Sequence, residues 1–349
     1  MAWIVSLFFA VNIGASGTAA SMAPAYGSGA VPRRWVALAL AAAAVTAGAL
    51  IDGAPVARTI GGGLVPARLF NAGTVVIVLL AASATLFGAN LLGVPLSTSE
   101  VTVGSIVGLG VADQSLQLNR ILLVVAMWLV MPAAAYLLAR GMARIQPWLR
   151  RLRTPHPPSS RRLAAWLIAA AGCGQAFAAG MNNVANAIGP LVGAHLASLA
   201  SSLIWGAVFV GLGAFLLGGR VLHTNAKKLV QLSLLDGGSA ALISGVLTAL
   251  ASLGGLPVPL TQASTMAILG LRKPLGAREA RSVAVRVLKI WMISPLLSLV
   301  ISYAAVAGFA HGHRLLLSLL AVLAAGLAVS ALRRASRRRA GRGPSSADD

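Results

Sequence analysis

The feature that most constrains this chain is a series of apolar runs, each about 20 residues long, from end to end. A helix needs a run of that length to cross the hydrocarbon core of a bilayer. No long polar domain remains between the runs, and 10% of the 349 residues are charged, whereas soluble domains carry roughly a quarter. The sequence therefore predicts an all-α polytopic membrane protein rather than a soluble protein with an anchor.

The apolar runs set the expected order of the spans. The first run lacks a basic N-terminal region, so we expect a retained span and not a cleaved signal peptide. Short amphiphilic pieces, GVPLSTSEVTVGSIVGLG and GLPVPLTQASTMAILGLR, follow the third and seventh runs. The predicted spans are 3–24, 34–51, 71–90, 119–141, 163–180 (running on towards 195), 200–218, 236–254, 284–308 and 314–332.

The net charge of +21 raises the possibility of nucleic-acid binding. Most of this charge, however, lies in loops, in the linker 144–162 and in the tail 333–342. That distribution is typical of the positive-inside rule, with attraction to anionic lipid head groups as a second effect. We therefore expect the lipid bilayer, and no nucleic acid, as a partner.

The two halves of the chain resemble each other at three places with nearly constant separation. The matched pairs are Thr59 with Thr224, Pro95 with Pro257, and Pro132 with Pro295, at separations of 165, 162 and 163 residues. These offsets predict an internal repeat. We expect a first transmembrane repeat at 1–141, a basic cytoplasmic linker at 142–162, a second repeat at 163–308, an extra transmembrane helix at 309–332 and a basic cytoplasmic tail at 333–349.

Loop charge predicts how the two repeats are related. The linker and the tail are both strongly basic, so both are expected in the cytoplasm. Because one extra span lies beside the second repeat, that repeat must cross an odd number of times, and the two copies must then insert in opposite orientations. This inverted-repeat design is typical of secondary transporters, with the site near mid-membrane. We expect a multi-pass protein of the inner (plasma) membrane with its N-terminus outside.

Polar residues concentrate first in the helix that opens each repeat. GMNNVANAIGP carries Asn182, Asn183 and Asn186, of which the first and last share a helix face. Ser16 and Thr18 lie in the matching stretch of the first repeat. Gly and Pro nearby allow both helices to break, and a broken helix exposes N–H groups that favour an anion. The alternative is helix–helix packing, in which small residues and asparagines join spans.

Polar residues concentrate next in the two segments after Pro95 and Pro257. The first carries Ser97, Thr98 and Ser99, and the second carries Thr261. A turn of this kind at membrane depth must lie inside protein or at a water-filled cavity. We therefore expect re-entrant hairpins whose hydroxyl groups reach the site, with an ordinary loop outside the membrane as the alternative.

Glu100 is the exceptional acidic residue, since it follows the hydroxyl cluster. An ionised and unpaired carboxylate there is costly, so we expect it to be protonated or paired with a cation, and we assign it to proton coupling. No metal-ligand set, nucleotide-binding loop or catalytic triad is recognisable, and the single cysteine, Cys173, lies in an apolar run. We therefore expect neither an enzyme nor a bound metal or cofactor.

These motifs together resemble one family. GMNNVANAIGP is similar to the GANDVANA-type signature of the inorganic phosphate transporter (PiT) family, and GVPLSTSEVTVGSIVGLG resembles the segment of that family containing P-[VL]-S-T-T-H. The resemblance covers about residues 5–308. It implies ion-coupled symport of phosphate, with the helix motif and hairpin of each repeat building one central site.

The chain departs from the family pattern at the charged positions. Asn183 replaces the signature aspartate in the second repeat, and Ser16, Gly17 and Ala20 stand where Asn, Asp and Asn are usual in the first. The hairpins have Glu100 and Gln262 for His, and the second has Pro259 and Leu260 for Ser and Thr. Loss of both aspartates weakens the expected sodium sites and favours protons as the coupling ion.

Three readings of the function follow from the resemblance and these departures. The first is alternating-access transport of inorganic phosphate, driven by H⁺ rather than Na⁺. The second is a sulfate or broad oxyanion permease, because a site with fewer acceptor carboxylates discriminates less against sulfate. The third is a non-transporting membrane binding or regulatory relative. A homo-oligomer is compatible with all three.

Overall fold

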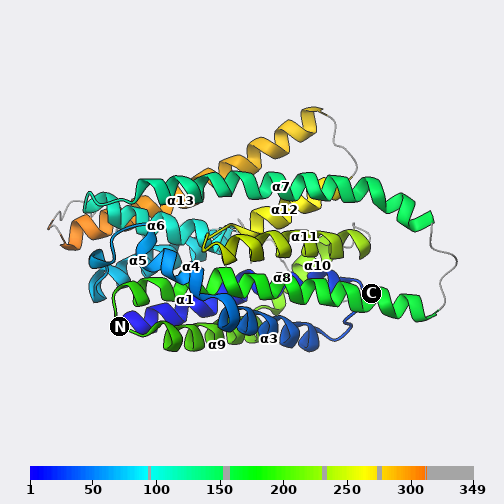
Figure 1. Ribbon diagram of the computed structural model, residues 1–349, viewed down its shortest axis with the longest axis horizontal. Coiled ribbons are helices and arrows are strands. Elements are labelled where there is room, and N and C mark those ends of the chain that lie inside the picture. Colours follow the sequence, from blue (N-terminus) through cyan, green and yellow to red (C-terminus); the bar gives the residue numbers. More distant parts are fainter. Residues whose placement is uncertain (93–95, 152–157, 230–233, 273–276, 311, 313–349) are drawn as a thin grey trace, which may run out of the picture.

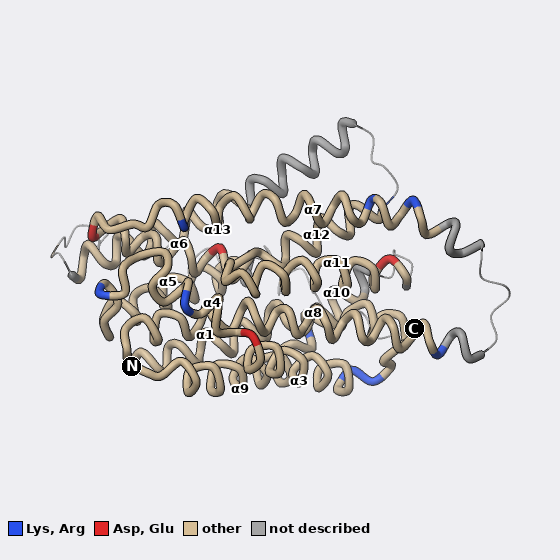
Figure 2. The backbone as a smooth tube through the Cα atoms, in the orientation of Figure 1, with Lys and Arg blue, Asp and Glu red and all other residues tan. Residues whose placement is uncertain are grey.

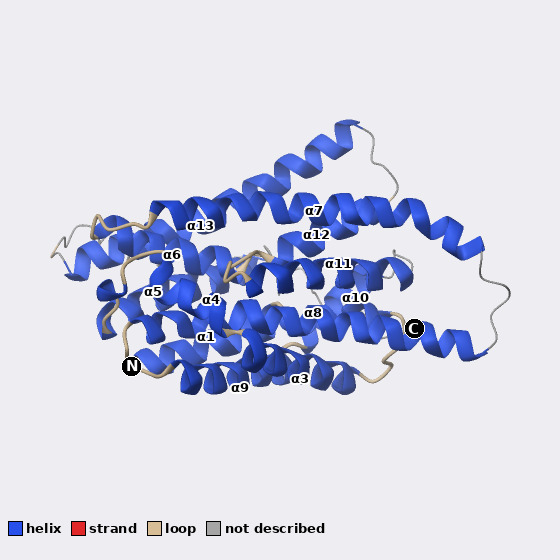
Figure 3. Cartoon of the chain, in the orientation of Figure 1, coloured by secondary structure: helices blue, strands red, loops and turns tan. Residues whose placement is uncertain are grey.

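The computed structural model describes residues 1–349 apart from 93–95, 152–157, 230–233, 273–276, 311 and 313–349 (Figure 1). Every regular element in the described part of the chain is a helix (Figure 3). The predicted all-α fold is therefore confirmed there. Most of the predicted extra helix at 309–332 and the whole tail at 333–349 lie outside the described residues.

Eight helical stretches among the described residues are long and apolar enough to cross a membrane, and they match the predicted spans up to residue 308. The long helices are α1 (Ala2–Ser16), α3 (Arg34–Asp52), α5 (Ala72–Leu92), α7 (Leu118–Arg151), α8 (Pro158–Gly193), α9 (Leu199–Leu217), α11 (Leu234–Leu253) and α13 (Ala277–Ala310). The shorter elements are η1 (Thr18–Met22), α2 (Ala23–Gly27), α4 (Ala54–Arg58), η2 (Thr59–Gly63), η3 (Ala67–Leu69), α6 (Thr98–Ala112), α10 (Gly219–Leu229) and α12 (Leu260–Leu271).

The outer surface of this bundle is apolar over much of its length. Leu122, Leu129, Leu216 and Met292 are each more than half exposed, although their chemistry suits a core. Figure 2 shows few charged residues along the helices of the described chain. An apolar exterior of this kind is stable only against lipid tails, so the fold is that of a multi-pass membrane protein.

The helices that open the two halves differ in continuity. α1 ends at Ser16, and the chain continues through Gly17 into the tight turns of η1. α8, in contrast, runs unbroken through Asn182 and Asn186 to Gly193. The predicted break is therefore found in the first helix and is wrong for the second. Pro190 lies in the last turn of α8, where its missing N–H removes one bond near a helix end and does not interrupt the helix.

Two pairs of helices, each with one member from either half of the chain, pack antiparallel. The Ser6 hydroxyl of α1 donates to the Ala187 carbonyl of α8 (2.8 Å). Met22, which follows α1, lies against Cys173, an earlier residue of α8. α1 and α8 are therefore antiparallel. α3 and α9 are also antiparallel. The Thr46 hydroxyl donates to the Ala207 carbonyl, and Gly53, later in the chain, lies beside Leu203, an earlier residue of α9.

The short helix of each half packs along the last long helix of the other half. α6 lies on α13 in a constant register, in which Glu100 meets Ser294, Gly104 meets Ser298 and Gly108 meets Ser302. α12 lies on α7, where Arg140 Nη1 donates to the Gly270 carbonyl (3.1 Å). This packing of α6 on α13 and of α12 on α7 holds both short helices inside the bundle, and α6 is buried over most of its length.

We expect Gly104→Ala to destabilise the protein, by about 1–3 kcal/mol, because a methyl group there overlaps the Pro295 backbone of α13. Gly88→Ala is the matched control, since nothing lies within 4 Å of an added Cβ at that helical position. Alanine there should be neutral or stabilising by up to about 1 kcal/mol. Thermal unfolding in detergent measures both. Equal midpoints for the two variants would contradict the close α6–α13 contact.

Candidate functional site

The asparagines of the opening motif lie at the centre of the bundle. Every residue from Met181 to Leu191 of α8 is buried, with Asn182 and Asn186 fully enclosed and Asn183 5% exposed. Buried amides of this kind need hydrogen-bond partners, since an unpaired amide in an apolar interior is costly.

Their first set of partners comes from the first turn of α6. Asn182 Nδ2 and Asn186 Nδ2 both donate to Ser99 Oγ, at 3.1 and 3.2 Å. Thr98 Oγ1 donates to Asn183 Oδ1 at 3.0 Å. We call Thr98, Ser99, Asn182, Asn183 and Asn186 the amide–hydroxyl cluster. It joins the preserved helix motif of the second half to the preserved Ser-Thr-Ser segment of the first. The assignment of these residues to one shared site stays a prediction.

A second set of partners comes from the segment before α12. Asn182 Nδ2 donates to the Val258 carbonyl (2.7 Å), and the Val258 N–H donates back to Asn182 Oδ1 (3.1 Å). Trp128 Nε1 of α7 holds the neighbouring Pro257 carbonyl (3.0 Å). Sequence reasoning missed Val258. The available signal was its position between Pro257 and Pro259, which keeps its backbone out of a regular helix and free to bond a side chain.

The remaining predicted site residues do not bond to the cluster. Ser97 is buried at the N-cap of α6 without a side-chain capping bond, and Thr261 lies half-buried in the first turn of α12. Ser16 Oγ donates to the Ile13 carbonyl of its own helix (3.3 Å). Thr18 is fully buried, and its Oγ1 has no partner among the described residues. The structure thus unites five of these residues through side-chain bonds and leaves four apart.

Glu100 points away from the amide–hydroxyl cluster although it follows Ser99. The Ser294 hydroxyl of α13 donates to Glu100 Oε2, while Oε1 has no partner in the described chain. The side chain is 1% exposed. Successive residues of a helix differ by about 100° in direction, so Ser99 can face α8 while Glu100 faces α13. The described residues also hold no group of His, Cys, Asp and Glu that could bind a metal ion.

A second polar group lies farther back on α8 and was not predicted. Gln175 Nε2 donates to Ser244 Oγ of α11 and to Ser264 Oγ of α12, both at 2.8 Å. Gln175 precedes Asn182 by two helical turns on the same face. Gln175 therefore joins α11 and α12 to α8, the helix that carries the three asparagines of the cluster. An isolated Gln in an apolar run was the only signal for it in the sequence.

Comparison with known proteins decides the family. The model of the phosphate transporter family matches residues 13–302. The chain belongs to the phosphate transporter family. This membership confirms the resemblance seen in the motifs, and it makes the protein a membrane transporter of this family and not an enzyme.

The proteins similar to this chain are named for different substrates. The chain is 43% identical over 336 residues to the sulfate permease CysP of Bacillus subtilis, covering 94% of this chain and 93% of the relative. It is 26% identical to a putative phosphate permease of Helicobacter pylori, covering 80% of this chain and 70% of that one. A solved sodium-dependent phosphate transporter superposes with a TM-score of 0.74 at 23% identity, covering 87% of this chain and 96% of that one, which supports the fold.

Proposed function

We propose that this member of the phosphate transporter family is a secondary active transporter of sulfate. Phosphate was the first expectation from the motifs, with sulfate as the alternative. The similarity to a sulfate permease over nearly the whole of both chains favours the alternative. The observation in the structure that carries the proposal is the balance of donors and acceptors in the amide–hydroxyl cluster.

The free groups of the cluster are mainly donors. The amide oxygens of Asn182 and Asn183 already accept bonds, from Val258 N–H and from Thr98 Oγ1. Ser99 Oγ accepts two bonds and donates none to a described residue, and the Asn183 amide nitrogen likewise has no acceptor among them. Asn186 Oδ1 is the one cluster oxygen without a described partner. Hydrogens thus outnumber acceptors in the groups that remain.

A surplus of donors suits sulfate better than phosphate. Sulfate is fully deprotonated near neutral pH and offers only acceptors, whereas phosphate keeps at least one proton that needs an acceptor. A buried carboxylate can accept a hydrogen bond from the protonated phosphate oxygen, and it repels sulfate, which has no such proton. No carboxylate belongs to the cluster, since Asn183 replaces the signature aspartate and Glu100 bonds to Ser294.

The proposed mechanism is alternating access between inverted repeats at 1–141 and 163–308. The antiparallel pairing of α1 with α8 and of α3 with α9 supports the inversion. The basic linker at 142–162 and tail at 333–349 support an outside N-terminus and a cytoplasmic C-terminus. The predicted site residues outside the cluster are proposed to reach the substrate only when the repeats move. They are Ser97, Thr261, Ser16 and Thr18. Glu100 is the group proposed to carry the coupled proton.

Radiolabelled uptake into proteoliposomes tests the substrate and the coupling ion together. We expect sulfate uptake that follows an imposed proton gradient, is unchanged by a sodium gradient, and needs about a tenfold or larger excess of phosphate for competition. Protein-free liposomes are the control. Uptake of phosphate in preference to sulfate would restore the first expectation. Sulfate-dependent thermal stabilisation without any uptake would instead identify a non-transporting relative.

A further inference from the structure

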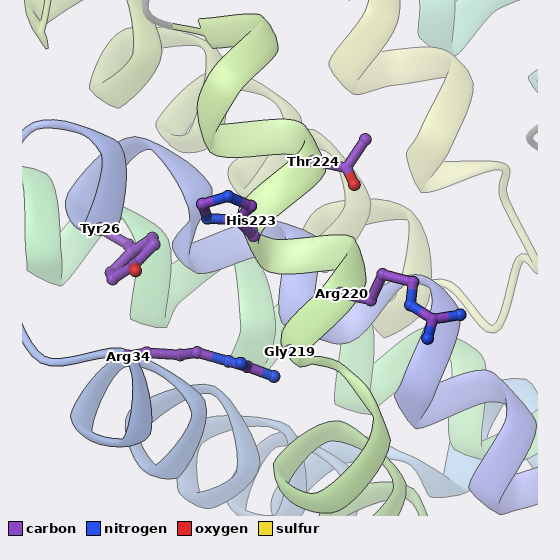
Figure 4. A pocket seen from close by; sticks show the side chains of 6 residues that line it. All are labelled: Tyr26, Arg34, Gly219, Arg220, His223 and Thr224. Atoms are coloured by element: carbon purple, nitrogen blue, oxygen red, sulfur yellow. The ribbon is translucent and has the colours of Figure 1, made fainter. Parts of the chain in front are cut away.

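A cavity outside the amide–hydroxyl cluster lies between α2, α10 and the start of α3 (Figure 4). Its volume is about 510 Å³, and it is lined by Tyr26, Arg34, Gly219, Arg220, His223 and Thr224. We call it the basic pocket. Tyr26 packs on the core cluster that contains Ile168 of α8, 14 residues before Asn182. At 1.5 Å per residue, Ile168 lies about 20 Å from Asn182 along α8, and no residue that lines the basic pocket belongs to the amide–hydroxyl cluster.

The chemistry of the basic pocket suits an anion with several oxygens. Its lining includes guanidinium, imidazole, phenol and hydroxyl groups and no carboxylate. In Figure 4 the Arg34 side chain extends to Gly219, with Tyr26 and His223 above it, whereas the Arg220 side chain points to the right, away from these three. A guanidinium group carries its donors in a planar fork that matches two oxygens of a tetrahedral oxyanion.

Gly219 leaves the space that the Arg34 guanidinium occupies, because it has no Cβ atom. A Cβ atom at residue 219 would overlap Nη2, Cζ and Nε of Arg34. These atoms form the end of a flexible side chain, so an added methyl group would displace the guanidinium without forcing the helices apart. The position of Arg34 is therefore coupled to glycine at 219.

We propose that the basic pocket is a peripheral site for a tetrahedral oxyanion, the same class of ion that the amide–hydroxyl cluster transports. This inference rests on the proposed sulfate transport. The pocket has room for the ion together with its hydration water, since one water takes about 30 Å³. The ion stays hydrated there, so binding is weak and falls with ionic strength. Its effect is to raise the local anion concentration at the end of the bundle where α2, α10 and the start of α3 meet.

Protection of an introduced thiol tests the proposal in the full-length protein. Thr224→Cys is made in a Cys173→Ala background, and its reaction with neutral N-ethylmaleimide is timed in neutral-lipid nanodiscs with and without sulfate. We expect sulfate to slow the labelling. Arg34→Gln should raise the sulfate concentration that gives half-maximal protection by about tenfold. Gly219→Ala should raise the same concentration although it retains every charge. Arg33→Gln, the matched control outside the lining, should leave protection unchanged.

Three outcomes would overturn the peripheral site. They are no protection by sulfate, equal protection of the Thr224→Cys thiol with and without Arg34→Gln, and an equal shift with Arg33→Gln. A lipid head group is distinguished with nanodiscs containing phosphatidylglycerol: slow labelling there without sulfate, and no further slowing by sulfate, would assign the pocket to lipid instead. Labelling needs no transport, so protection without uptake would reject the proposed function alone, and uptake without protection would reject the pocket alone.

Discussion

Replacing Asn182 with alanine is expected to abolish sulfate uptake, lowering the initial rate by roughly 100-fold or more, the size expected when a binding group is misplaced by about 1 Å. Asn182 is the residue that holds both incoming segments at once. Its amide bonds Ser99 in the first turn of α6 and the Val258 backbone before α12. Alanine leaves the Val258 N–H buried without its partner, and leaves the Val258 carbonyl with only its bond from the Leu260 N–H. Both α6 and the segment before α12 thereby lose their shared contact with α8.

The same substitution should also lower the free energy of unfolding. Each buried polar group left unpaired costs roughly 1–3 kcal/mol, so we expect a total loss of about 3 kcal/mol. Initial uptake rates normalised to reconstituted protein, with thermal unfolding in detergent, measure the two effects. Asn12→Ala is the matched control, because its only described side-chain bond is a long one, 3.5 Å, to the Phe8 carbonyl.

We expect substitutions within the cluster to separate the effect on transport from the effect on stability. Thr98→Ala and Asn186→Ala each remove a single described side-chain bond, so they should cost less stability than Asn182→Ala while still abolishing uptake. Membrane insertion should be intact in both. Wild-type uptake by both variants would show that the amide–hydroxyl cluster packs helices together and does not bind the transported ion.

Replacing Glu100 with glutamine is expected to abolish proton-driven accumulation of sulfate and to leave sulfate–sulfate exchange intact. The carboxyl group is buried, bonds to Ser294, and has no described ion-pair partner. An ionised carboxylate in such a place is costly, so binding and release of a proton can be linked to movement of α6 against α13. Glutamine has the same shape and keeps a bond to Ser294, but it cannot release a proton.

Two assays on the same proteoliposomes separate these activities. Net uptake under an imposed proton gradient measures coupling, and exchange of labelled for unlabelled sulfate at equal pH measures binding and rearrangement. Asp52→Asn, a carboxyl removed at the end of α3, is the control and should behave as wild type in both. Full proton-driven accumulation by Glu100→Gln would exclude this carboxyl from coupling.

Much of the architecture follows from local sequence patterns. Span length depends on a run of neighbouring apolar residues, so the eight described spans could be placed without any tertiary contact. The family followed from two short motifs, and the clustering of Thr98 and Ser99 with the three asparagines followed from treating the halves as copies that share one site. These conclusions need only the order of residues along the chain.

Other properties depend on how each helix is rotated and what it packs against. The sequence allowed α8 to break at Gly180–Pro190, but its burial among other helices and the late position of Pro190 keep it continuous. Adjacent residues Ser99 and Glu100 serve different partners because α6 lies between α8 and α13. The hydropathy of a residue is local, whereas the direction of its side chain is fixed by neighbours from distant parts of the chain. Sequence alone therefore determined the spans, the family and the residue types of the candidate site, and only the tertiary structure decided that the Val258 backbone bonds Asn182 and that Glu100 faces α13.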